Sequence, residues 1–69
     1  MSKAKSKIAA NMKKCRKKLG ISQDRLSKNA DVTYNTIIKI ESGVTSNPRV
    51  DTLKRIADAL KVKIDDLMK

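Results

Sequence analysis

The feature that most restricts the fold of this chain is the spacing of its apolar residues between positions 22 and 43. Leu26 and Ala30 are four residues apart, and Ile37 and Ile40 are three residues apart. Both spacings are typical of one face of a helix, while the residues between the two pairs interrupt the pattern. The segment therefore predicts two short helices that meet at a tight turn.

Residues at the ends of these two helices fit the same interpretation. Ser22 and Thr33 each precede a helical pattern, where a side-chain oxygen can accept from the free N–H groups of the first turn. Asn29 and Asp31 lie at the turn, and Asn and Asp tolerate the left-handed conformation better than other non-glycine residues. Gly43 stands where a glycine would end the second helix.

The segment resembles the helix-turn-helix of the Cro/C1-type (XRE) family, which includes the lambdoid phage repressors. Counted from Gln23 as the first position of the motif, the apolar positions of the family are all filled, by Leu26, Ala30, Val32, Ile37 and Ile40. The chain has Ser27 where the family usually has Ala, and Asp31 where it usually has Gly. The resemblance covers residues 8–68, and its most specific part is the run I-x-x-I-E-S-G at 37–43. It implies an all-α fold, a compact five-helix bundle of lambda-repressor-like type.

The rest of the chain supplies three more helical patterns. An apolar stripe before Gly20 consists of Ile8, Met12, Cys15 and Leu19, which places Cys15 in the core rather than in a reactive site. A second stripe follows Pro48 and consists of Val50, Leu53, Ile56, Ala57 and Leu60. The last apolar cluster consists of Val62, Ile64, Leu67 and Met68. Where the family usually has a helix-ending Gly and a capping Ser or Asp, this chain has Lys61 and Lys63.

Charge indicates the kind of partner. The chain has 17 Lys and Arg residues against 7 acidic residues, a net charge of +10, which is typical of domains that bind polyanions. Residues 1–28 carry a net +9 and residues 29–69 a net +1. Residues 1–7 read as a flexible basic arm, either solvated or lying along DNA phosphates, and residues 8–69 as a single domain.

The resemblance also implies one internal ion pair and a set of base-reading residues. In the family an Arg at the place of Arg16 commonly pairs with the Glu that ends the second helix of the motif, here Glu41. That second helix enters the major groove of DNA, and Tyr34, Asn35 and Lys39 occupy its base-reading places. Asn35 suits adenine, Lys39 suits guanine, and Tyr34 suits a thymine methyl group or a phosphate.

Two further sets of residues follow from the resemblance. The residues placed against the DNA backbone are Gln23, Lys28, Thr33, Thr45, Ser46, Asn47 and Arg49. The residues placed at a homodimer interface are Val44, Val50, Ile64, Leu67 and Met68. Against the second set stands the alternative that these apolar residues are all needed inside a five-helix core. The lysines between residues 13 and 18 are interpreted as a solvated face that can steer DNA from a distance.

The expected function is that of a sequence-specific regulator of transcription, most simply a repressor, which binds a palindromic operator in double-stranded DNA as a homodimer. Activation, as in controller proteins of restriction–modification systems, fits the same residues. The alternative is an antitoxin-type protein that binds a partner protein and also controls its own promoter. No cofactor, metal, small-molecule ligand or membrane association is expected, because the chain has no His, one Cys and no long apolar run. The expected location is the cytoplasm, and an enzyme is not expected.

Overall fold

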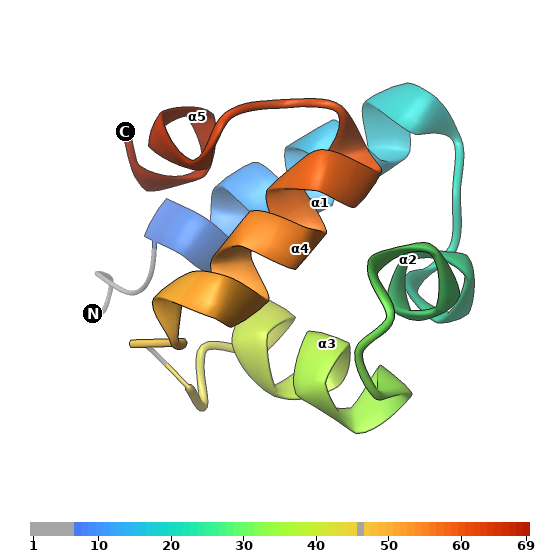
Figure 1. Ribbon diagram of the computed structural model, residues 1–69, viewed down its shortest axis with the longest axis horizontal. Helices are drawn as coiled ribbons and strands as arrows, with labels where there is room; N and C mark the ends of the chain where they lie inside the picture. The colour runs from blue at the N-terminus through green and yellow to red at the C-terminus, as the bar shows by residue number, and fades with distance from the viewer. Residues whose placement is uncertain (1–6, 46) are drawn as a thin grey trace.

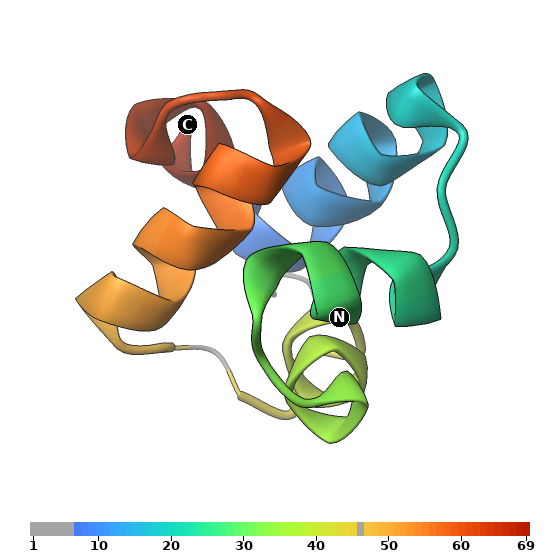
Figure 2. The same ribbon diagram turned by 45° about the vertical axis from the view of Figure 1, so that its right-hand side comes forward.

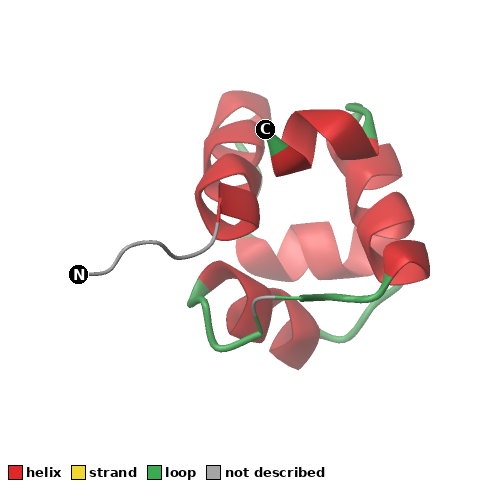
Figure 3. Ribbon diagram, turned by 90° about the vertical axis from the view of Figure 1, so that its left-hand side faces the viewer, coloured by secondary structure: helices red, strands yellow, loops and turns green. Residues whose placement is uncertain are grey.

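Helices account for the regular structure of the chain. A computed structural model describes residues 7–45 and 47–69, and over these residues it contains helices and no strand (Figure 3). The helices are α1 (Lys7–Leu19), α2 (Gln23–Ala30), α3 (Tyr34–Glu41), α4 (Val50–Leu60) and α5 (Ile64–Met68). The predicted all-α, five-helix class is confirmed. The proposed arm at residues 1–6 and the proposed backbone contact Ser46 lie outside the described residues, and Lys7, expected in the arm, begins α1.

The helices surround one apolar core. α1 packs against α3 and α5, while α2 packs against α3 and α4. In Figure 1, α4 crosses in front of α1, and α3 lies at the bottom of the molecule while α5 lies at the top. Figure 2 shows α3 directly beneath α2. The side chains that are completely or almost completely buried are Met12, Leu26, Ile37, Ile40, Ile56, Leu60 and Leu67.

Two of the connections between helices have the same backbone geometry. The first joint comprises residues 31–33, between α2 and α3, and the second comprises residues 61–63, between α4 and α5. Asp31 and Lys61 both adopt the left-handed conformation, with φ of 59° and 62°. The N–H groups of these residues and of the valines after them bond back to carbonyls of the preceding helix, so each joint is a Schellman-type ending.

The residues that start the next helix differ between the joints. Thr33 Oγ1 accepts from the N–H of Thr36 at 3.1 Å, so the predicted cap of α3 is present. Lys63 has no side-chain oxygen that could cap α5, and instead its own N–H donates to Asp66 Oδ2 at 3.1 Å. The less complete capping predicted for Lys63 is therefore observed, and one carboxylate partly compensates for it.

The last helix is fastened to the first. Asn11 Nδ2 donates to the carbonyl oxygens of Leu67 at 2.8 Å and Lys69 at 3.1 Å, which satisfies carbonyls that the end of α5 leaves without helical partners. The Leu67 side chain is 0% exposed and belongs to the core. The prediction that Leu67 lies at a dimer interface is wrong for this conformation, because α5 turns that side chain inward to complete the core.

Candidate nucleic-acid interface

The outer side of α3 carries the side chains predicted to read bases. Ile37 and Ile40 are buried to 1% exposure or less, which fixes the rotation of the helix about its axis. Tyr34, Asn35 and Lys39 are consequently exposed, and Tyr34 retains 50% of its accessible surface. Within residues 7–45 and 47–69, these three side chains make no hydrogen bond or ion pair, so their polar groups are free to bind an external partner.

A buried polar cluster holds the end of α3 in place. Arg16 and Glu41 form a bidentate ion pair between α1 and α3. Arg16 Nε donates to Glu41 Oε2 at 3.0 Å, and Arg16 Nη2 donates to Glu41 Oε1 at 3.1 Å. The Glu41 side chain is 1% exposed and that of Arg16 is 14% exposed. Arg16 Nη1 also donates to the carbonyl of Ile21 at 3.1 Å. The ion pair implied by the family resemblance is present, and its burial makes it sensitive to loss of either partner.

Gln23 belongs to this same cluster, which the sequence did not predict. Its Nε2 donates to Glu41 Oε1 at 2.9 Å, so the first residue of α2 is bonded to the last residue of α3. An amide nitrogen carries two hydrogens, and the bond to Glu41 uses one of them. The other hydrogen remains for the phosphate contact assigned to Gln23. Contact between residues 23 and 41 depends on the angle between the two helices, and no local sequence signal encodes it.

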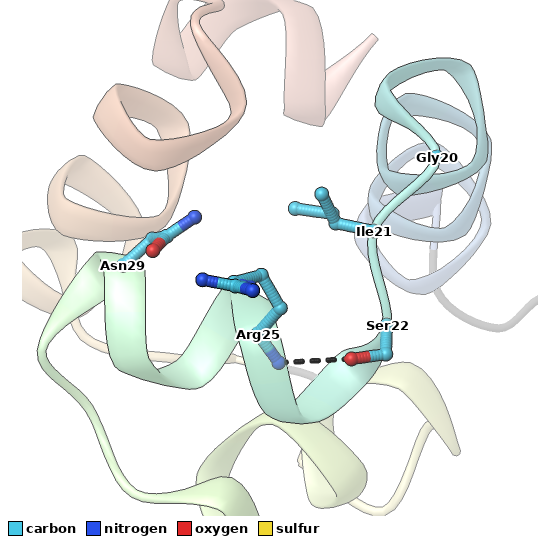
Figure 4. Close-up of a pocket in the computed structure, with 5 residues that line it drawn as sticks. All are labelled: Gly20, Ile21, Ser22, Arg25 and Asn29. Carbon is cyan, nitrogen blue, oxygen red and sulfur yellow. Dashed lines mark hydrogen bonds between the residues drawn. The ribbon is translucent and has the colours of Figure 1, made fainter.

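The start of α2 lies beside an open hollow of about 600 Å³ at the α1–α2 connection. Figure 4 shows Ser22 Oγ accepting from the N–H of Arg25, at 3.0 Å, which is the cap predicted for this helix. Arg25 and Asn29 project from α2 on the side of Ile21. Within the described part of the chain, neither of these two side chains has a hydrogen-bonding partner. The free N–H groups at the start of a helix favour a negatively charged neighbour such as a phosphate.

Several of the residues predicted to contact the DNA backbone lie together beside α3. A groove of about 270 Å³ is lined by Thr36, Lys39, Ile40, Thr45, Asn47, Pro48, Arg49 and Thr52. It brings the predicted backbone residues Thr45, Asn47 and Arg49 next to the predicted base reader Lys39. Thr36 and Thr52 were missed by the sequence analysis because they lie on different helices and share no motif.

Two other predicted backbone residues already have partners on their own helices. Lys28 Nζ lies 3.4 Å from Asp24 Oδ2, in an ion pair whose side chains are both well exposed. Thr33 Oγ1 caps α3 and lies 2.8 Å from the hydroxyl of Thr36. An exposed ion pair contributes little to stability, so Lys28 can exchange its partner at small cost.

The residues predicted at the dimer interface differ widely in exposure. Val44 and Val50 are 76% and 72% exposed and flank the α3–α4 connection, while Met68 is 53% exposed on α5. Ile64 is half-buried against the core, and Leu67 is inside it. Of the predicted set, Val44, Val50 and Met68 are therefore the residues most exposed to a second copy.

Residues 7–45 and 47–69 contain no group of three or more His, Cys, Asp or Glu side chains that could hold a metal ion. Over the same ranges, none of the helices has the length and hydrophobicity that a membrane crossing requires.

Two short helices joined by a left-handed turn, the second with one exposed side and a buried, anchored end, have the arrangement of a helix-turn-helix. The sequence profile of the helix-turn-helix family HTH_3, the XRE/Cro/C1 type, matches residues 12–67, and the chain belongs to this family of DNA-binding transcription regulators. The resemblance identified from the sequence is thereby confirmed. A comparison with curated protein sequences gave no match.

Proposed function

We propose that the protein is a sequence-specific repressor that places α3 in the major groove and binds a palindromic operator as a homodimer in the cytoplasm. The observation that carries this proposal is the state of Tyr34, Asn35 and Lys39, which are exposed and without partners among the described residues on a helix that is fixed from behind. Repression follows when the operator overlaps a promoter, because the bound protein then blocks access to it.

The three side chains suit different base edges. The amide of Asn35 can donate to and accept from adenine at the same time, and the ammonium group of Lys39 can donate to the acceptors of guanine. The ring of Tyr34 can contact a thymine methyl group, and its hydroxyl can reach a phosphate. Each good base contact discriminates against the wrong base by about 1–3 kcal/mol.

Backbone contacts would set the position of α3 in the groove. Gln23 at the start of α2 and the groove residues Thr45, Asn47 and Arg49 lie on two sides of α3, so they can hold neighbouring stretches of phosphates. Lys28 and Thr33 add contacts of the same kind. A homodimer built through Val44 and Val50 would place two copies of α3 in successive major grooves, about 34 Å apart.

The test is selection of randomised duplexes by the purified protein at about 200 mM salt, where binding driven only by phosphates is strongly weakened. Enrichment of a palindrome with half-sites about ten base pairs apart is the expected result. Asn35→Ala and Lys39→Ala should then each lose discrimination at one base position. The matched controls are Asn29→Ala on the outer side of α2 and Lys54→Ala on α4, which should leave the selected sequence unchanged.

Absence of any enriched sequence, with binding persisting at low salt, would contradict the proposal. The net charge would then account for the DNA binding, and the antitoxin-type alternative would be tested by purifying the protein from its host together with any partner of fixed stoichiometry. Enrichment of a single half-site would contradict the homodimer alone.

A further inference from the structure

A second strongly basic surface lies on α1. It is formed by five exposed lysines, called here the α1 lysine face: Lys7, Lys13, Lys14, Lys17 and Lys18. α1 contains no acidic residue, and the first acidic residue of the whole chain is Asp24. Within the part of the chain that the structure describes, none of the five ammonium groups takes part in an ion pair or a hydrogen bond.

This concentration of charge works against the helix that carries it. Lys13 and Lys17, and likewise Lys14 and Lys18, are four residues apart, so their like charges lie side by side on the helix surface. Positive charge in the last turn of α1 is favourable for the helix dipole, but Lys7 in the first turn is not. These repulsions lower the stability of α1, and a bound anion such as a phosphate would relieve them.

Part of this face points away from the recognition helix. At about 100° per residue, Lys14 and Lys18 each lie about 160° around α1 from Arg16, and Lys7 lies about 180° from it. Arg16 reaches toward α3, where it pairs with Glu41. In Figure 3, α3 occupies the bottom of the molecule, below α1. A duplex held by α3 therefore lies on a different side from this row of lysines.

The row has dimensions that match a stretch of DNA backbone. From Lys7 to Lys18 the helix rises about 16 Å at about 1.5 Å per residue. One strand of B-DNA carries a phosphate for each 3.4 Å or so of axis, so the row is about as long as five phosphates. Insertion into a membrane would need apolar anchors such as Trp or Phe, and the chain contains neither.

We propose that Lys7, Lys14 and Lys18 form a second, sequence-independent DNA-binding surface, which holds the backbone of a separate duplex segment while α3 occupies its own site. The protein then bridges two segments of DNA. This inference rests on DNA binding by the family and does not require that the operator proposed above exists, because α3 can hold a duplex of any sequence at low salt.

The experiment compares two variants that each lose two positive charges. Lys14→Gln/Lys18→Gln removes the centre of the row, and Lys54→Gln/Lys61→Gln removes two exposed lysines of the α4–α5 region that have no ion-pair partner among the described residues. A duplex of about 20 base pairs is fixed to beads and saturated with protein, and capture of a second, labelled duplex is measured at about 50 mM salt.

The wild-type protein and the Lys54→Gln/Lys61→Gln control should capture the second duplex. Lys14→Gln/Lys18→Gln should lower the capture at least about tenfold, because each lost phosphate contact removes a counterion-release contribution that is large at low salt. Binding of either variant to a single short duplex should keep the wild-type salt slope. Circular dichroism and the melting temperature establish that both variants are folded.

Three results would overturn the proposal. The first is failure of the wild-type protein to capture a second duplex. The second is a salt slope on a single duplex that falls by about 1.8 in Lys14→Gln/Lys18→Gln, which would place these lysines on the same duplex as α3. The third is equal capture by the two variants. Binding to anionic vesicles that only Lys14→Gln/Lys18→Gln loses, with DNA capture intact, would identify a membrane as the partner instead.

Discussion

The two joints, residues 31–33 and 61–63, have the same backbone and different side chains. Both place a non-glycine residue in the left-handed conformation and then a half-buried valine, Val32 or Val62. The first joint ends in a threonine that caps α3, whereas the second ends in a lysine that cannot cap α5. The joint before α3, the helix proposed to read bases, is thus the better capped of the two.

The elements after the two joints are also anchored differently. α3 is held at its end by the buried Glu41, which accepts hydrogen bonds from α1 and α2. α5 is held by the apolar side chain of Leu67 and by Asn11 at its end. The first is a polar anchor, in which loss of one partner leaves a buried charge unpaired, and the second is mainly an apolar anchor, in which loss of the side chain leaves a cavity. The difference can be tested by removing each anchor and then by changing each joint.

The largest effect should come from the polar anchor. Glu41→Leu leaves the guanidinium of Arg16 buried without its partner and should lower the free energy of unfolding by about 3–5 kcal/mol. Arg16→Met/Glu41→Leu should recover most of this loss, because both charges are then gone. Urea unfolding followed by circular dichroism measures both. Asp51→Asn is the control, since its exposed ion pair with Arg49 should contribute under about 1 kcal/mol.

The apolar anchor comes next. Leu67→Ala removes a fully buried side chain and should lower the free energy of unfolding by about 2–5 kcal/mol, with hydrogen exchange accelerated in α5 more than in α3. Met68→Ala, at an exposed neighbour, is the matched control and should change little. A small effect at Leu67 with a loss of dimer in sedimentation would return Leu67 to the interface first assigned to it.

A smaller change of opposite sign is expected at the second joint. Lys61→Gly should raise the free energy of unfolding by about 1 kcal/mol, because the left-handed conformation disfavours a residue with a Cβ. Asp31→Gly should gain less, since Asp tolerates that conformation and its carboxylate lies 3.9 Å from Arg55 Nη1. Thermal melts of the two variants compare the joints directly. Equal gains would show that the side chain of Asp31 contributes nothing there.

The smallest effect concerns Asp66, whose carboxylate substitutes for the missing cap. Its hydrogen bond from the Lys63 backbone N–H, together with Lys69, holds the pKa of Asp66 below its ordinary value of 3.8. A carboxylate with a lowered pKa in the folded state stabilises the fold above its unfolded pKa and loses that contribution as the pH falls through the folded value. The melting temperature of Asp66→Asn should therefore lie below that of the wild type at pH 6. The two should converge below the folded pKa. A constant difference down to pH 2 would contradict this explanation.

The helix-turn-helix could be predicted from the sequence because its signals are local. Ser22, Thr33 and the apolar spacing act within a turn or two of the chain, and the structure confirms both caps. The pair of Arg16 and Glu41 was available only through the family resemblance, because nothing near either residue in the sequence indicates the other.

The features that could not be predicted depend on how distant helices meet. Asn11 and Leu67 are bonded although they are 56 residues apart. α5 is a helix of 5 residues, too short for periodicity to separate its inner side from its outer side, so Leu67 and Met68 looked equivalent in the sequence. The hydrogen bond from Gln23 to Glu41 was missed because it depends on how α2 and α3 meet. The base-reading and backbone roles remain predictions.

The hydrogen bond from Asn11 to the carbonyl of Lys69 also holds the C-terminal end close to the first helix. Lys69 lies against the second turn of α1, and Figure 1 shows the first turn of α1 and the C-terminal end on the same side of the molecule, away from α2. A circular permutant that joins Lys69 to Lys7 through a short linker should therefore fold without any change in how α3 is presented.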